Sequence, residues 1–207
     1  IIFISSDVKT DSSGKSNLRF IKRDIDSLRK ALPEKNLIIM SQVNPGFTKD
    51  IVWNKDKLFY QVETLVFGDA FKRALNPDRI ILGTHNPLKK INNDIKNFYS
   101  IFNCPIIKTD YSTAELIKIS INLYLISSIT TTNLISQIVK KIGGCWGDLE
   151  NSLRLDKRIG KYAYLKPGLG ISGGNLERDL HNVMDISKKK GVSTKLFKIW
   201  NENSLHQ

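Results

Sequence analysis

The sequence predicts an α/β protein, with a mainly parallel sheet in its first half and only helices in its second half. Up to residue 111, short apolar runs alternate with helical patterns, as expected for strands joined by right-handed helical crossovers. From residue 112 onwards, no strand pattern interrupts a long helical stretch. We therefore expect two domains, at residues 1–111 and 112–207.

In the first half, strands and helices are expected to alternate along the chain. The expected strands are Ile1–Ile4, Leu37–Val43, Arg79–Gly83 and Pro105–Lys108. The expected helices are Asn17–Leu32, Phe47–Trp53 and Leu88–Phe102. The first of these helices has apolar residues at the spacing of one helix face, namely Leu18, Ile21, Ile25, Leu28 and Leu32. The order of elements predicts a parallel sheet.

The first expected strand is not followed by the glycine-rich loop that opens most dinucleotide-binding domains. That loop has the form G-x-G-x-x-G, because glycines let the backbone approach a pyrophosphate. Here Ser5, Ser6 and Asp7 follow the strand, and Gly14 is the only glycine before Gly46. The sequence therefore predicts a partial Rossmann-like sheet without its first strand–helix–strand unit.

In the second half, Thr113–Ile142 is expected to be one helix, capped by Ser112 or Thr113, with Glu115 in its first turn, and ended by Gly143 and Gly144. A helix of this length either connects two domains or is shared between subunits. Shorter helices are expected at Trp146–Leu155 and Glu177–Lys190. The second half is thus expected to be all-α.

Composition excludes several classes of protein. The chain is 41% hydrophobic and 25% charged, so a folded protein is expected. Its net charge of +12 comes from Lys and Arg spread along its length, which favours a phosphorylated small ligand over nucleic acid. The uncharged stretch Ile119–Val139 contains many polar residues, so we expect a buried helix and no membrane span.

The cysteines and histidines predict neither disulfides nor a metal site. Cys104 and Cys145 form no CxxC motif, and the three histidines are isolated from one another. We therefore expect a cytoplasmic protein without a bound metal.

Lys118 and Asn122 are four residues apart in the long helix and should share one face. An ammonium and a carboxamide pointing to one place suit a developing oxyanion. The alternative is that Lys118 is solvated and Asn122 bonds to a neighbouring helix.

Two further segments are candidates for ligand binding. Residues 167–175 contain four glycines and lead into a helix, where backbone N–H groups could contact a ligand and Asp179 lies one turn on. Arg158, shortly before Gly160, could hold a phosphate or carboxylate with two hydrogen bonds. The alternatives are an ordinary turn and a surface arginine.

Six motifs, taken in order, resemble the UDP-glucose/GDP-mannose dehydrogenase family across nearly the whole chain. They are Ser41–Gly46, Val62–Leu65, Asn76–Gly83, Thr113–Lys118 with Asn122, Asp156–Gly160 and the glycine-rich turn. The resemblance implies the later half of the NAD-binding domain followed by the central helical dimerisation domain. The family's first βαβ unit and its C-terminal UDP-binding domain would be missing.

The resemblance implies NAD-dependent oxidation of the C6 alcohol of a UDP- or GDP-hexose to the uronic acid. In the family, two hydride transfers occur, and a cysteine thiolate captures the intermediate aldehyde on the way to a thioester. A homodimer is implied, with the long helix packed on its twofold mate through Leu123, Ile126 or Ile129.

The same resemblance implies the roles of individual residues. The implied catalytic positions are Lys118, Asn122, Asn175 and Asp179. The implied substrate-binding residues are Glu63, Lys118, Asn122, Arg158, Lys166, Gly168, Gly170 and Ser172. The implied cofactor-binding residues are Gln42 and Phe67.

The sequence departs from the family pattern at several polar positions. Asn175 stands where the family has its nucleophilic cysteine, and an amide cannot form a hemithioacetal. The other departures are Gln42 for Thr, Phe67 for Glu, Arg178 for Lys and Leu134 for Glu. We expect an altered dehydrogenase, which could stop at the aldehyde. The alternative is a catalytically silent paralogue that binds a nucleotide sugar or serves in dimerisation.

Overall fold

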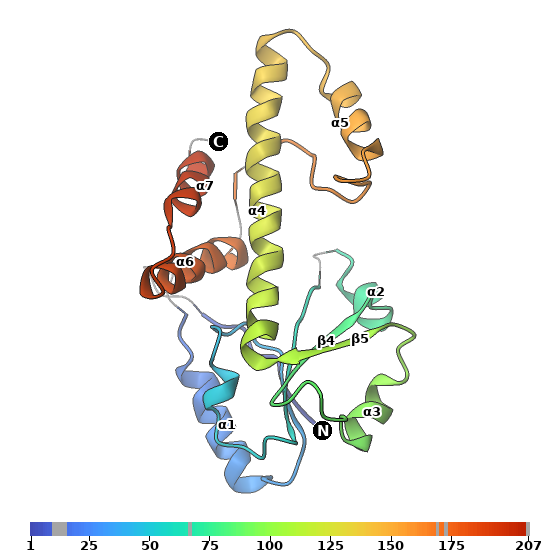
Figure 1. The fold of residues 1–207 in the computed structure, drawn as a ribbon, viewed down its shortest axis with the longest axis vertical. Coiled ribbons are helices and arrows are strands. Elements are labelled where there is room, and N and C mark those ends of the chain that lie inside the picture. The colour runs from blue at the N-terminus through green and yellow to red at the C-terminus, as the bar shows by residue number, and fades with distance from the viewer. Residues whose placement is uncertain (10–15, 66–67, 169, 172–173, 206–207) are drawn as a thin grey trace. The chain divides into compact units, whose positions relative to one another are not determined.

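The computed structural model describes residues 1–9, 16–65, 68–168, 170–171 and 174–205. Its strands are β1 (Ile2–Ile4), β2 (Leu37–Ile39), β3 (Leu58–Gln61), β4 (Ile80–Thr84) and β5 (Ile106–Asp110). Its helices are α1 (Arg19–Ala31), the 3₁₀ helix η1 (Thr48–Asp50), α2 (Ala70–Leu75), α3 (Asn93–Tyr99), α4 (Tyr111–Lys141), α5 (Trp146–Leu155), α6 (Gly174–Lys189) and α7 (Lys195–Leu205). The predicted α/β class with a long helix is confirmed (Figure 1).

The five strands form one sheet in the order β1-β2-β3-β4-β5. All neighbouring pairs are parallel except β3 and β4, which are antiparallel. The prediction of a mainly parallel sheet is therefore confirmed. Because the chain direction reverses between β3 and β4, the carboxyl ends of β1, β2 and β3 lie at one edge of the sheet. The carboxyl ends of β4 and β5 lie at the opposite edge.

Each face of the sheet has its own apolar core, because successive side chains of a strand point to opposite faces. On one face, Leu37, Ile39, Leu58 and Tyr60 pack with Ile21 and Ile25 of α1 and with Tyr111 and Ala114 of α4. On the other face, Ile38, Phe59, Ile80 and Leu82 pack with Ile95 and Tyr99 of α3. The helical spacing predicted for α1 thus reflects a real buried stripe.

Some expected elements differ from the structure. The expected helix Phe47–Trp53 is wrong, since only Thr48–Asp50 is helical and it is a 3₁₀ turn. The turn stops at Ile51, whose backbone is extended with a φ of −70° and a ψ of 131°. The expected helix Leu88–Phe102 is shorter, since Asn92 caps α3 by accepting from the Ile95 N–H.

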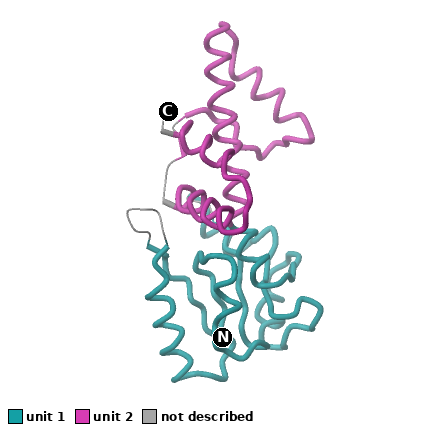
Figure 2. Tube along the Cα trace, turned by 60° about the vertical axis from the view of Figure 1, so that its left-hand side comes forward, with its two compact units in different colours: residues 1–118 teal, residues 119–207 magenta. Residues whose placement is uncertain are grey.

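The described chain divides into two compact units, residues 1–118 and 119–207 (Figure 2). The second unit is helical. Its core contains Ile119 and Ile126 of α4, Ile171, and Leu180 and Val183 of α6, with Phe197 and Trp200 of α7 packed against them. The division falls inside α4, whose first turns belong to the core of unit 1.

The long helix α4 has 31 residues and begins at Tyr111. The predicted caps Ser112 and Thr113 are wrong. The cap is Asp110, which accepts from the N–H of Thr113 at 3.0 Å and from its hydroxyl at 2.6 Å. The helix ends before Gly143, as predicted. In the described parts of the chain, no helix is long and apolar enough to cross a membrane.

Candidate functional site

The carboxyl ends of β1, β2 and β3 collect polar residues at one edge of the sheet. The Ser41 hydroxyl donates to the carbonyl of Ser6 at 2.7 Å, which ties the segments that follow β1 and β2 together. Gln42 is the next residue and is half-buried. Glu63 follows β3, and its carboxylate accepts from the N–H of Thr64 at 2.7 Å. Phe67 lies outside the described residues.

A buried carboxylate lies close behind this edge. Glu115, on the second turn of α4, has no exposed surface. Its two oxygens accept hydrogen bonds from the backbone N–H groups of Gly46 at 2.5 Å and Thr48 at 2.8 Å. Burial raises the pKa of Glu115 above its usual value, although these donors oppose the shift. The sequence placed Glu115 in the first turn of the helix but gave no sign of these partners.

In the second unit, α4 and α6 are joined by a buried polar contact. The Asn122 amide nitrogen donates to the Asp179 carboxylate at 2.6 Å. Asn122 is 6% exposed and Asp179 is fully buried. Asn122 therefore bonds to a neighbouring helix, which was the alternative considered for it. Lys118, half-buried, lies four residues earlier on the same helix.

Arg178 extends this contact to Asn175, at the start of α6. Its Nη2 donates to the Asn175 side-chain oxygen at 2.7 Å. Its Nε lies 3.8 Å from an oxygen of Asp179, and the Arg178 side chain is 5% exposed. Asn175, Arg178, Asp179 and Asn122 thus form one chain of polar contacts, which we call the α4–α6 network. The buried guanidinium faces a buried carboxylate, so both charges have a partner.

The glycine-rich segment is held by side chains of α4 and α7. The Gly168 N–H donates to the Asn133 side-chain oxygen at 3.0 Å. The Ile171 N–H donates to the Ser204 hydroxyl at 2.5 Å. At Gly170 a side chain has no room, because an ideal Cβ would lie 2.5 Å from the Ser204 carbonyl oxygen. Lys166 is exposed, and Ser172 lies outside the described residues.

Arg158 lies in an exposed loop after α5. Its guanidinium donates to both oxygens of Asp156, at 3.0 and 2.6 Å, while 89% of its side chain is exposed. This hydrogen bond lowers the pKa of Asp156. The structure thus pairs Arg158 with a residue of its own loop and keeps it accessible.

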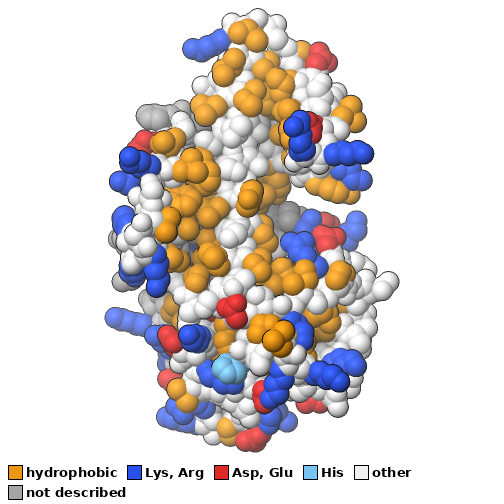
Figure 3. Space-filling model, viewed as in Figure 1, with side chains coloured by type: hydrophobic (Ala, Val, Ile, Leu, Met, Phe, Trp, Pro, Cys, Tyr) orange, Lys and Arg blue, Asp and Glu red, His pale blue; other side chains and the backbone are white. Residues whose placement is uncertain are grey.

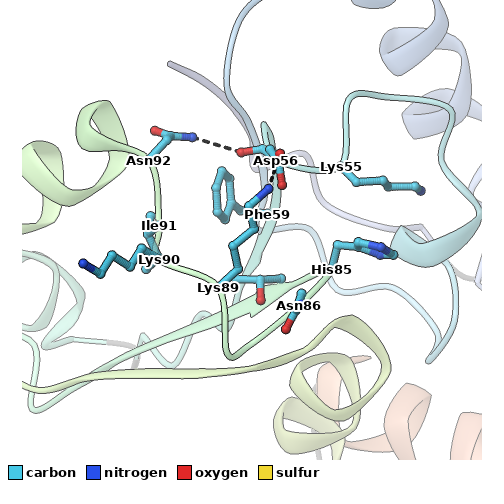
Figure 4. Close-up of a pocket in the computed structure, with 10 residues that line it drawn as sticks. Lys55, Asp56, Phe59, His85, Asn86, Lys89, Lys90, Ile91 and Asn92 are labelled. Atoms are coloured by element: carbon cyan, nitrogen blue, oxygen red, sulfur yellow. Dashed lines mark hydrogen bonds and ion pairs between the residues drawn. The ribbon is translucent and has the colours of Figure 1, made fainter.

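A pocket of about 140 Å³ lies at the opposite sheet edge, where β4 ends (Figure 4). Lys89 crosses it to form a 2.6 Å ion pair with Asp56, and Asn92 donates to the Asp56 carbonyl. None of the predicted site residues lines this pocket. Among the residues that the structure describes, no group of three or more His, Cys, Asp or Glu is placed to hold a metal ion.

Comparisons with known proteins agree on one family. Residues 112–204 match the model of the UDP-glucose/GDP-mannose dehydrogenase family, central domain. The chain is 30% identical to a UDP-glucose 6-dehydrogenase of Rickettsia bellii, over 94% of this chain and 46% of that protein. It is 26% identical to the UDP-glucose 6-dehydrogenase TuaD of Bacillus subtilis, over 95% of this chain and 44% of that protein.

A solved structure shows the same fold. The UDP-glucose dehydrogenase of Pyrobaculum islandicum superposes with a TM-score of 0.85 at 21% identity, over 99% of this chain and 50% of that one. The chain therefore spans about half the length of the relatives that it matches.

Proposed function

We propose that this chain, whose residues 112–204 match the central domain of the UDP-glucose/GDP-mannose dehydrogenase family, belongs to an NAD-dependent dehydrogenase of nucleotide sugars. The reaction is oxidation at the C6 alcohol of a UDP- or GDP-hexose. The observation that carries the proposal is the buried hydrogen bond between Asn122 and Asp179. It supports the proposal because it brings two of the implied catalytic side chains into direct contact.

In the proposed reaction, each side chain of the site has a separate task. Lys118 supplies positive charge and Asn122 a directed hydrogen bond to the oxygen at C6, where negative charge develops. Asp179 serves as the proton acceptor that takes the proton of the C6 hydroxyl through a water molecule. The hydrogen bond from Asn122 and the nearby charge of Arg178 fix the orientation of its carboxylate. Glu63, Lys166, Gly168, Gly170 and Ser172 are proposed to contact the sugar. Arg158, being exposed, is free to reach a nucleotide sugar bound by a second subunit.

The residues of unit 1 fit a dinucleotide cofactor. Three adjacent parallel strands end at one edge, and the carboxyl ends of parallel strands are where α/β proteins bind nucleotides. Gln42 is the residue proposed to hold NAD there, and the family resemblance adds Phe67, which lies outside the described residues. When bound, NAD would accept the hydride from C6.

Asn175 limits how far the proposed oxidation can go. The family's second oxidation requires a thiolate at this position, and the Asn175 carboxamide offers none. Its oxygen is already engaged by Arg178. We therefore propose that the chemistry stops after the first hydride transfer, with the aldehyde as product.

The contact between Arg178 and Asn175 also favours a second candidate function. A nucleophile position filled by a structural hydrogen bond suits a catalytically silent paralogue that binds a nucleotide sugar or serves in dimerisation. Exposed apolar side chains gather along the C-terminal half of α4 and directly after its last residue (Figure 3). They are Leu134, Ile138 and Ile142, and they are the surface that we propose for a homodimer. Leu123 and Ile126 instead pack in the unit's own core.

The proposal is tested by following NADH absorbance when the full-length protein, as its gene encodes it, receives NAD and a panel of UDP- and GDP-hexoses. We expect NADH with at least one sugar, and a loss of about a hundredfold in rate for Asp179→Asn. The matched control is Asp185→Asn, an exposed aspartate of the same helix, which should leave the rate unchanged. Calorimetric binding of a sugar without NADH would favour the silent paralogue. If the protein neither binds a sugar nor forms NADH, the dehydrogenase and the sugar-binding paralogue are both contradicted, and only the role in dimerisation is left.

A further inference from the structure

Glu115 makes a contact that the proposed reaction does not use. It is fully buried on α4, and each of its two carboxylate oxygens accepts one backbone N–H, from Gly46 and from Thr48. These two residues belong to the loop that follows β2. One side chain thus fastens this loop to the long helix at two points, within unit 1.

The chemistry of the contact requires a carboxylate. Two converging N–H donors need two acceptors on one side chain, and only Asp and Glu provide acceptors alone. A glutamine would turn an NH₂ group toward one of the donors, and an aspartate is shorter by one methylene. Gly46 has a φ of +99°, a backbone conformation that side chains disfavour, so the loop turns at that residue in a way that suits glycine.

The contact joins two parts of the proposed site. Ser41 and Gln42 lie near the start of the same loop, at the edge where the cofactor is proposed to bind. Ser41 is itself tied to the segment after β1 through the Ser6 carbonyl. On the helix side, Lys118 lies three residues after Glu115, one turn further along α4. Glu115 therefore lies between the end of β2 and the proposed oxyanion-stabilising lysine.

We propose that Glu115 is a positioning residue, which fixes the cofactor-binding end of β2 relative to Lys118. This inference rests on the proposed function, since it assumes that NAD binds beside Gln42. Glu115 touches neither ligand in this account and acts through the loop. Its loss should therefore weaken NAD binding at the loop without altering contacts that the nucleotide sugar makes in unit 2.

The test compares Glu115→Gln with the wild type in the full-length protein. The matched control is Glu34→Gln, the same change at an exposed glutamate that pairs with Lys57. We expect the dissociation constant of NAD, measured by calorimetry, to rise about tenfold or more in Glu115→Gln, because hydrogen bonds to a charged group are lost. The dissociation constant of the nucleotide sugar should stay within about twofold. The amides of Gly46 and Thr48 should also exchange hydrogen faster.

A merely structural role predicts a different pattern. A destabilised protein would show fewer active molecules, and the folded fraction would keep its NAD affinity. Unchanged NAD affinity in Glu115→Gln would therefore overturn the inference and leave the proposed function intact. If the wild type itself binds no NAD, the proposed function fails, and the positioning role of Glu115 fails with it.

Discussion

The amide of Asn122 and the carboxylate of Asp179 meet at 2.6 Å in the interior of the helical unit, although 57 residues separate them in the sequence. Asp179 also faces the guanidinium of Arg178 at 3.8 Å. The position of the carboxylate is thus set by one hydrogen bond from a neutral amide and by one ion pair with a guanidinium. This arrangement makes Asn122 important for stability, in addition to its proposed role in the reaction.

Replacement of Asn122 by alanine should destabilise the helical unit. The substitution leaves the buried Asp179 carboxylate without one of its donors, at a cost of about 1–3 kcal/mol. The free energy of unfolding in urea measures this loss. Asn97→Ala, at an exposed position of α3, is the control and should change stability by less than about 0.5 kcal/mol. Equal stabilities of the two variants would contradict the role of the hydrogen bond.

The glycine-rich segment offers a matched pair of substitutions. At Gly170, an added Cβ would lie 2.5 Å from the carbonyl oxygen and 2.9 Å from the Cα of Ser204. At Gly168, an added Cβ would meet nothing within 4 Å. We expect Gly170→Ala to lose about 1–3 kcal/mol of stability through overpacking. Gly168→Ala should have a urea midpoint of unfolding close to that of the wild type. A greater loss of stability in Gly168→Ala than in Gly170→Ala would contradict the close packing of Gly170 against Ser204.

The cap of α4 predicts a dependence on pH. The hydroxyl and then the N–H of Thr113 lower the pKa of Asp110 below 3.8. A lowered folded-state pKa stabilises the protein above the unfolded value, and this stabilisation is lost as the pH falls from there through the folded pKa. At pH 7, Asp110→Ala should therefore cost about 1 kcal/mol, the usual value of a helix cap.

Asp110→Asn separates the cap from the charge. Asparagine keeps an acceptor for the Thr113 N–H but does not titrate. Urea unfolding at several pH values should show the difference between wild type and Asp110→Ala shrinking below pH 3.8. The difference between Asp110→Asn and Asp110→Ala should stay constant. A wild-type advantage that grows on acidification would show that the cap assignment is wrong.

Much of the fold could be predicted because it rests on local patterns. Helix α5 has the predicted bounds, Trp146–Leu155, and α4 differs from its prediction by two residues at its start and one at its end. Strand β3 was not predicted, since Leu58–Gln61 has only three apolar residues in a row. It becomes a strand because β2 and β4 pair with it on both sides. Helices α2 and α7 were also missed.

The site was predicted less completely than the fold. Spacing alone placed Lys118 and Asn122 on one helix, and the resemblance pointed to Asp179. Neither could show that Asn122 donates to Asp179 or that Asn175 bonds to Arg178, because such contacts depend on how helices pack. Glu115 was predicted only as a residue of the first turn, since its partners Gly46 and Thr48 lie 69 and 67 residues away.

Asn175→Cys tests whether the missing thiol is the main defect. The variant restores a group that can capture an aldehyde as a hemithioacetal, so we expect uronic acid to appear where the wild type forms little. Mass spectrometry of the products after incubation with NAD and the preferred nucleotide sugar measures this. Asn175→Ser, which adds a weaker nucleophile, is the control. An absence of acid with Asn175→Cys would mean that Arg178, Phe67 or another departure also blocks the second oxidation.

The most direct test is the number of NADH molecules formed for each molecule of nucleotide sugar consumed by the full-length wild-type protein. Because the family resemblance implies a nucleophilic cysteine where this chain has Asn175, the account predicts fewer than two NADH per sugar and an aldehyde among the products. Two NADH per sugar with the uronic acid as the sole product would contradict it.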